Sequence, residues 1–162
     1  MVIQRIQSLF LLCTAIVNAL LFFMPVASLT VPNNFTYEFY TTKVVQMGEI
    51  PVFITWNWMS MILTIAIVVL AFGTIFVHKG NTKSVKPTLF LQLRLSVANI
   101  ILQLGLIVLV WMQLRGRAGE LSADWNANLS FIFPLIGVIF TWLALRGIVK
   151  DITVLKSFDR IR

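Results

Sequence analysis

The sequence has few of the residues that catalysis, metal binding or disulfide formation require. Cys13 is the only cysteine, which excludes an internal disulfide, a CxxC redox pair and a cysteine-ligated metal cluster. His78 is the only histidine, which excludes a bis-histidine haem site. The phosphate-binding P-loop, the dinucleotide fingerprint and the GxSxG and HExxH motifs are all missing. We therefore expect no catalytic residue, cofactor or metal ligand.

Charged residues are also scarce. They make up 12% of the chain, against about 25% in a typical soluble domain, while apolar residues make up 59%. The net charge of +7 does not indicate nucleic acid as a partner, because the basic residues lie at the edges of apolar blocks and form no run interleaved with aromatics. Lipid is therefore the expected surrounding of most of the chain.

Four long apolar blocks predict the fold. A lipid-spanning helix needs about 20 mainly apolar residues, and this requirement is met, without any Asp, Glu or Lys, by residues 8–29, 56–77, 89–112 and 129–148. The chain should therefore be a single membrane domain of the all-α class, with four transmembrane helices in one bundle. A cleavable signal peptide ending near Ala27 is the alternative for the first block, and its removal would leave three spans. We favour a retained helix, because the apolar stretch is long and the cleavage signal is weak.

The distribution of lysine and arginine predicts the orientation. One side of the membrane would hold an inner loop, residues 78–88, and an inner tail, residues 149–162; the other side would hold outer loops at 30–55 and 113–128. The inner side carries ten basic residues and the outer side three. Because basic residues concentrate on the cytoplasmic side, both termini are expected in the cytoplasm. The inner residues expected to contact anionic lipid or a partner are Arg5, Arg94, Lys150, Lys156, Arg160 and Arg162.

The loops and the tail have patterns of their own. Residues 35–42 are rich in β-branched and aromatic side chains in near alternation and are flanked by turn-forming residues, so a small β-hairpin capping the bundle is expected. The second outer loop is polar and is expected to hold a short helical turn. The tail has apolar residues near helical spacing between charges, which predicts an amphipathic extension on the inner membrane surface or, alternatively, a docking peptide for a cytoplasmic partner.

Polar side chains form a stripe on the third predicted helix. Gln92, Ser96, Asn99 and Gln103 are spaced by four, three and four residues, so they share one helix face, and Asn18 in the first block is a candidate partner. Amides are costly in hydrocarbon, so the stripe should face protein or water. It either forms interhelical hydrogen bonds or lines a polar pathway. The lack of an acidic residue in the spans favours hydrogen bonding.

Several segments, at both ends and in the third predicted helix, point to a family. They are residues 1–10 (MVIQRIQSLF), 20–27 (LLFFMPVA), 91–95 (LQLRL), 143–151 (LALRGIVKD) and 157–162 (SFDRIR). They resemble a family of small four-span bacterial inner-membrane proteins, the domain of unknown function 4293. The resemblance implies the bacterial cytoplasmic membrane and a retained first helix. It brings no activity or catalytic residue, and the tail departs from the family pattern at Ile152 and Thr153, where a second acid is usual.

The leading hypothesis for function is a non-enzymatic accessory or scaffold subunit of a cell-envelope complex. Its partners would be membrane lipids and either another membrane protein or a second copy of the chain. The first alternative is a small homodimeric transporter, in which the polar stripe lines a water-accessible cavity. The second is a membrane enzyme that acts on a lipid at the outer surface through Glu38, Glu49, Glu120 or Asp124.

Overall fold

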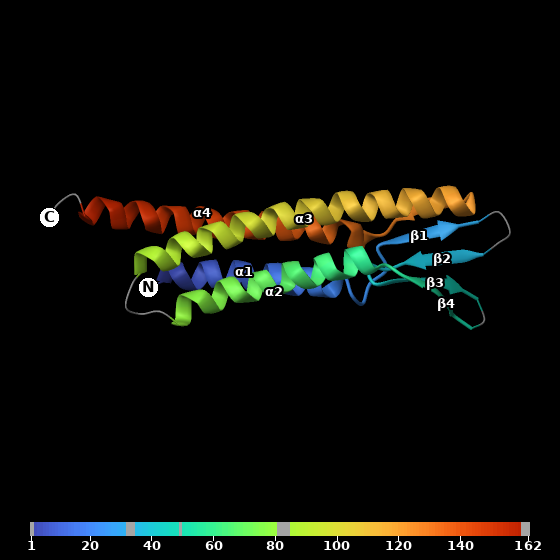
Figure 1. Ribbon diagram of the computed structural model, residues 1–162, viewed down its shortest axis with the longest axis horizontal. Helices are drawn as coiled ribbons and strands as arrows, with labels where there is room; N and C mark the ends of the chain where they lie inside the picture. Colours follow the sequence, from blue (N-terminus) through green and yellow to red (C-terminus); the bar gives the residue numbers. More distant parts are fainter. Residues whose placement is uncertain (1, 32–34, 49, 81–84, 160–162) are drawn as a thin grey trace.

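The computed structural model describes the chain except residues 1, 32–34, 49, 81–84 and 160–162. Within the described residues, four long helices lie side by side and a five-stranded sheet lies at one end of them (Figure 1). The start of α1 and the end of α4 lie at the opposite end from the sheet. The helices are α1 (Val2–Leu20), α2 (Trp58–Gly80), α3 (Val85–Leu121), the short 3-10 helix η1 (Leu129–Ile132) and α4 (Phe133–Asp159).

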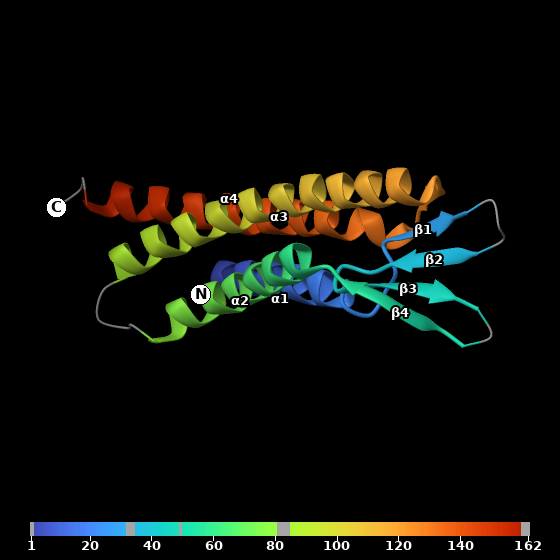
Figure 2. The same ribbon diagram turned by 45° about the vertical axis from the view of Figure 1, so that its right-hand side comes forward.

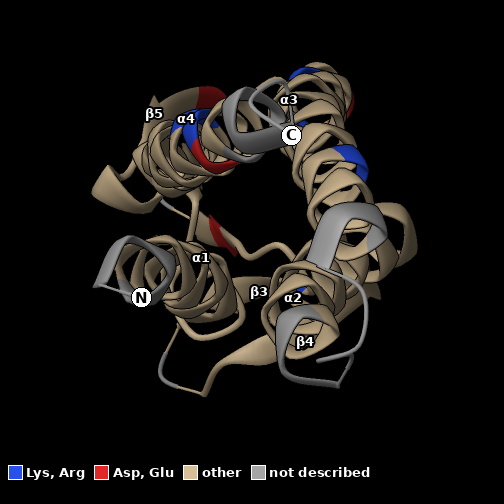
Figure 3. Cartoon of the chain, turned by 90° about the vertical axis from the view of Figure 1, so that its left-hand side faces the viewer, with Lys and Arg blue, Asp and Glu red and all other residues tan. Residues whose placement is uncertain are grey.

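The four long helices pack as a ring in which α1 contacts α2 and α4, and α3 contacts the same two helices from the other side (Figure 3). Their outward faces are apolar: Ile62, Val69 and Phe76 on α2 are 60%, 61% and 64% exposed. Their inward faces carry polar residues such as Asn18 and Gln103, which are fully buried. A soluble bundle has the reverse arrangement, with an apolar inside and a polar outside. The helices therefore suit lipid as the surrounding solvent.

Three of the described helical segments are long and apolar enough to cross a membrane: Trp58–Val77, Thr88–Leu121 and Leu129–Val154. Ile6–Leu20 is a shorter apolar helix. The chain is thus consistent with a multi-pass membrane protein.

The first predicted span, residues 8–29, is wrong over its last nine residues, 21–29. Helix α1 ends at Leu20, and residues Ala27–Thr30 form strand β1 instead. Pro25 has no backbone N–H to donate and disfavours helical geometry in the residue before it. Beyond it, Ala27 and Leu29 are buried while Ser28 and Thr30 are more exposed, which is the two-residue period of a strand. Hydropathy alone does not distinguish this strand from the end of a transmembrane helix, because both are apolar.

Helix α3 is longer than the predicted span 89–112. Its 37 residues reach about 55 Å, well beyond the roughly 30 Å of a bilayer's hydrocarbon core. Residues 113–121, predicted as loop, are helical because most of them are strong helix formers. The helix ends where Ser122 takes a left-handed φ of 47°. There the N–H groups of Ser122 and Ala123 donate to the carbonyls of Gly119 and Ala118, as in a Schellman cap.

The inner loop and inner tail are also more helical than expected. Helix α2 continues to Gly80 and α3 begins at Val85, so most of the predicted loop 78–88 is helical. Helix α4 continues without a break through Asp159. The predicted extension is therefore a prolongation of α4 along its own axis rather than a separate helix on the membrane surface (Figure 1).

The sheet is larger than the predicted hairpin. It is antiparallel with the order β4-β3-β2-β1-β5 and extends past the ends of α1 and α2 (Figure 2). The expected strand at residues 35–42 is confirmed as β2, and it pairs with β3 in a hairpin. The second outer loop, in which a short helical turn was expected, holds the end of α3 as far as Leu121 and then strand β5. The strands are β1 (Ala27–Thr30), β2 (Thr36–Phe39), β3 (Lys43–Met47), β4 (Val52–Trp56) and β5 (Asp124–Ala127).

One hydrophobic core joins the sheet to the helices. Leu29 from β1, Phe39 from β2 and Val44 from β3 belong to the same buried cluster as residues of α2 and α3. The helix residues in this cluster are Ile67, Leu106, Val110, Leu114 and Ala118. The sheet is therefore fixed against the end of α3 that extends beside it (Figure 1).

Candidate functional site

The predicted polar stripe lies inside the ring of helices. Asn18, Ser96, Asn99 and Gln103 are fully buried, and Gln92 is 6% exposed. All four stripe residues of α3 thus face protein rather than lipid, and Asn18 approaches them from α1.

Hydrogen bonds connect the stripe to neighbouring helices. The Nε2 of Gln103 donates to Oγ1 of Thr141 on α4 over 3.0 Å and to Oδ1 of Asn99 over 3.3 Å. The hydroxyls of Thr141 and Thr14, on α4 and α1, lie 3.2 Å apart and share a hydrogen bond. Farther along α3, Nε2 of Gln92 donates to the backbone carbonyl of Thr74 on α2 over 3.2 Å. The stripe therefore contributes hydrogen bonds between α3 and both of its neighbours.

Gly137 on α4 lies where side chains of α1 and α3 come close to the backbone of α4. A Cβ atom placed on Gly137 would collide with Oε1 of Gln103 and Nδ2 of Asn18. Asn18 donates from the same nitrogen to the carbonyl of Thr14, one turn earlier on α1, over 2.9 Å. The structure thus brings Asn18 and Gln103 to one place, as the sequence suggested, with glycine as the residue that leaves room for both.

Several buried polar atoms of this cluster have no hydrogen-bond partner among the described residues: Oδ1 of Asn18, Oγ of Ser96, Nδ2 of Asn99 and Oε1 of Gln103. A buried polar group without a partner costs about 1–3 kcal/mol. The four atoms include acceptors and a donor, so they can hydrogen-bond water or a small polar molecule. They include no group that titrates near neutral pH, so the cluster can bind and orient but cannot exchange protons by itself.

Thr14, Thr74 and Thr141 belong to this network although sequence reasoning did not assign them to the stripe. Thr14 lies four residues before Asn18, so a search for polar residues on one face of each helix would have found it. Thr141 was recognisable only as a small residue near Gly137. A threonine bonded to its own helix backbone has no distinguishing pattern in the sequence.

Only two of the six predicted inner basic residues have side chains that the structure describes. Arg94 and Lys150 are exposed, Arg160 and Arg162 lie outside the described residues, and so do the side chains of Arg5 and Lys156. The nearby carboxylate of Asp151 accepts a hydrogen bond from Nε2 of Gln7 over 2.8 Å, which links α4 to α1.

The three outer carboxylates that the structure describes, Glu38, Glu120 and Asp124, lie on different elements. Glu38 accepts a 2.7 Å hydrogen bond from the Tyr40 hydroxyl, and this bond, with burial and the charge of Glu38, raises the pKa of Tyr40 to about 12. Glu120 pairs with Arg117 at the end of α3. Asp124 lies on β5, with β1 between it and the strand of Glu38, and Glu49 lies outside the described residues. Among the residues that the structure describes, no three His, Cys, Asp or Glu lie together as metal ligands would.

Comparison with known proteins identifies the family but no activity. No curated protein matches the chain. The family model for the domain of unknown function DUF4293 matches residues 3–161. This is the family that the terminal segments resemble, and it assigns no role to any residue. Because the match covers nearly the whole length, the chain belongs to the DUF4293 family.

Proposed function

We propose that the protein is a four-span bacterial inner-membrane protein with both termini in the cytoplasm, acting as a non-enzymatic accessory or scaffold subunit of a cell-envelope complex. The helix ends support this topology, because α1 begins and α4 ends at the same end of the molecule (Figure 1). The excess of basic residues at that end supports its cytoplasmic location. The sheet then lies on the outer side of the membrane.

The observation that carries the accessory role is the exposed edge of the sheet at β4. Val52, Phe53, Ile54 and Trp56 are between 45% and 53% exposed, and β4 has a neighbour on one side only. Edge strands of independent proteins are usually protected by charge, proline or a cover, because their free N–H and C=O groups pair with other strands. The opposite edge, β5, carries Asp124 and Asn126, whereas β4 has no charged residue. This apolar edge supports a partner that binds at β4.

Lysines on the β4 edge test this role. We expect the double change Val52→Lys/Ile54→Lys to prevent a protein partner from binding. The tagged full-length protein is extracted from its own membrane in mild detergent, and the mass of the complex is measured by native mass spectrometry. Both side chains are about half exposed, so the free energy of unfolding should change by no more than about 0.5 kcal/mol per residue. Met47→Lys, at the exposed end of β3, is the matched control. A complex that survives the double change, or a homodimer without any partner, contradicts the proposal.

A small transporter is the second candidate, and the unpartnered buried atoms of the polar stripe favour it. If these atoms line a pathway, water must reach them. We would place single cysteines at Gln92, Asn99 and Gln103 in a Cys13→Ser background and treat membranes with a water-soluble thiol reagent. The accessory role predicts no labelling at the three buried positions, with Lys150→Cys as the exposed control. Labelling at all three would assign the stripe to a water-filled path and favour transport.

A further inference from the structure

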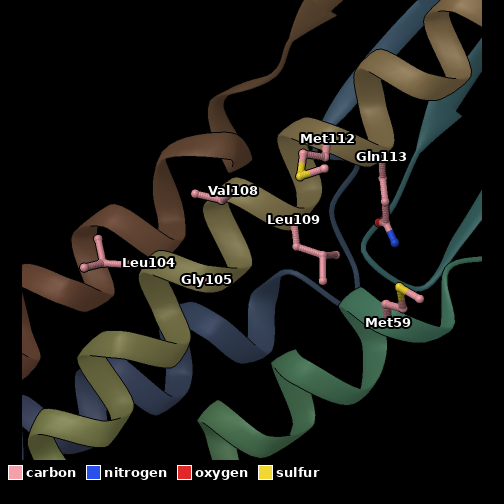
Figure 4. Close-up of a pocket in the computed structure, with 7 residues that line it drawn as sticks. All are labelled: Met59, Leu104, Gly105, Val108, Leu109, Met112 and Gln113. Atoms are coloured by element: carbon pink, nitrogen blue, oxygen red, sulfur yellow. The ribbon is translucent and has the colours of Figure 1, made fainter.

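A groove lies between α2 and α3 near the sheet end of the helices, and we call it the α2–α3 groove. Its apolar section has a volume of about 660 Å³ and is lined by Met59 on α2 and by residues of α3 that include Leu104, Val108 and Met112 (Figure 4). Its polar section has a volume of about 390 Å³ and lies beside Trp58, Arg117 and Glu120. The two sections share Met59 and Gln113, so they adjoin. One molecule with an apolar and a charged part can occupy both.

Two glycines of α3 line this groove. Gly105 lines the apolar section and Gly116 the polar section, and a Cβ atom added to either would meet nothing within 4 Å. Glycine in a helix interior is destabilising relative to alanine. Close helix packing explains such a residue at Gly137 but not at Gly105 or Gly116. The space beside them is therefore free for a molecule other than this chain.

The charges at the polar section select the kind of molecule. Arg117 and Glu120 form an ion pair of 3.2 Å, and their side chains are 38% and 67% exposed. One cation and one anion side by side complement a head group that carries one phosphate and one ammonium. Trp56 and Trp58 line the same section, and tryptophan prefers the level of lipid head groups. A partner helix would fill the apolar section without using this pair of charges.

The dimensions agree with a lipid that lies in one leaflet. Gly105 and Arg117 are twelve residues apart on one helix, which is about 18 Å along its axis. Half of the hydrocarbon core of a bilayer is about 15 Å thick. A head group at Arg117 thus places the end of an acyl chain near Gly105. Gln113 lies between Gly105 and Arg117, where the two sections of the groove meet. The glycerol esters of the lipid would lie beside it.

We propose that the α2–α3 groove binds one zwitterionic phospholipid, with its phosphate against Arg117, its primary ammonium against Glu120 and one acyl chain along the apolar section. Binding requires insertion in a membrane but does not depend on the accessory role.

Lipid titration of the full-length protein, followed by native mass spectrometry, tests this site. The probes are phosphatidylethanolamine and phosphatidylglycerol with identical acyl chains, since the second has the phosphate but no ammonium. We expect the first molecule of phosphatidylethanolamine to bind roughly tenfold more tightly than the first molecule of phosphatidylglycerol, because only its ammonium can form a charge-assisted hydrogen bond with Glu120. The change Glu120→Gln should remove this preference. Equal binding of both lipids to the unchanged protein would overturn the assignment of the ammonium to Glu120.

A side chain that fills the groove tests the acyl-chain position. Gly105→Leu should weaken the binding of both lipids by roughly tenfold or more, since it takes the space of the chain. Gly73→Leu, at an exposed glycine of α2 outside the groove, is the control and should change nothing. Unchanged binding in Gly105→Leu overturns the site, and so does a dimer mass that disappears with this substitution and carries no lipid. Because Glu120 is exposed, Glu120→Gln keeps the test decisive if Gly105→Leu does not fold.

Discussion

Replacing Phe39 by alanine is expected to lower the free energy of unfolding by about 3–5 kcal/mol. Phe39 is fully buried and is among the largest side chains of the core that joins the sheet to α2 and α3. Its removal leaves a cavity where the sheet packs against the helices, and the hydrogen bonds that Asn57 and Ser60 donate to the carbonyls of Tyr40 and Thr41 do not fill it. Thermal unfolding in detergent, followed by intrinsic tryptophan fluorescence, measures the loss.

Phe35→Ala is the matched control for Phe39→Ala. Phe35 lies just before β2, has the same side chain and is 48% exposed, so its replacement should cost less than about 1 kcal/mol. Equal effects of the two substitutions would mean that the sheet does not depend on its contact with α2 and α3. The proposed docking edge at β4 would then be mobile relative to the helices instead of being held at a fixed place beside them.

The parts of the fold that depend on local pattern were predictable from sequence. Apolar blocks located α2, the middle of α3 and α4, and alternation located β2. The parts that depend on pairing between distant segments were not. Strand β1 pairs with β5, so residues 27–30 lie beside residues 124–127. Neither segment has a sequence pattern that predicts this pairing. Ala27–Thr30 in particular has the apolarity of a span and becomes a strand because it has two neighbours.

The candidate site also has a part that the sequence predicts and a part that it does not. The spacing of Gln92, Ser96, Asn99 and Gln103 identified one face of α3 because helical periodicity is local. The contact of that face with Gly137 and Thr141 depends on how α4 packs, which the spacing does not contain. The α2–α3 groove was missed for the same reason, since Gly105 and Gly116 are informative only when the space beside them is known.

Gly137→Ala is expected to lower the free energy of unfolding by about 1–3 kcal/mol, although alanine is the better helix former by about 1 kcal/mol. The added methyl group would collide with the amides of Gln103 and Asn18. These side chains are fully buried and held by hydrogen bonds to Thr141, Asn99 and Thr14, so they cannot move aside without breaking bonds. Chemical unfolding in detergent measures the cost. Gly73→Ala is the control and should be neutral or slightly stabilising, because nothing lies within 4 Å of its new Cβ.

A second substitution shows whether the amides are the cause. In a Gln103→Ala background, the cost of Gly137→Ala should fall by about half or more, since one of the two obstructing side chains is gone and neighbouring substitutions are not additive. An undiminished cost would place the obstruction elsewhere. If Gly137→Ala were instead neutral in the unchanged protein, the amides would have room to move, as they would beside water. The stripe would then be a loosely packed polar interior. This result would favour a polar pathway over a packing role for the stripe.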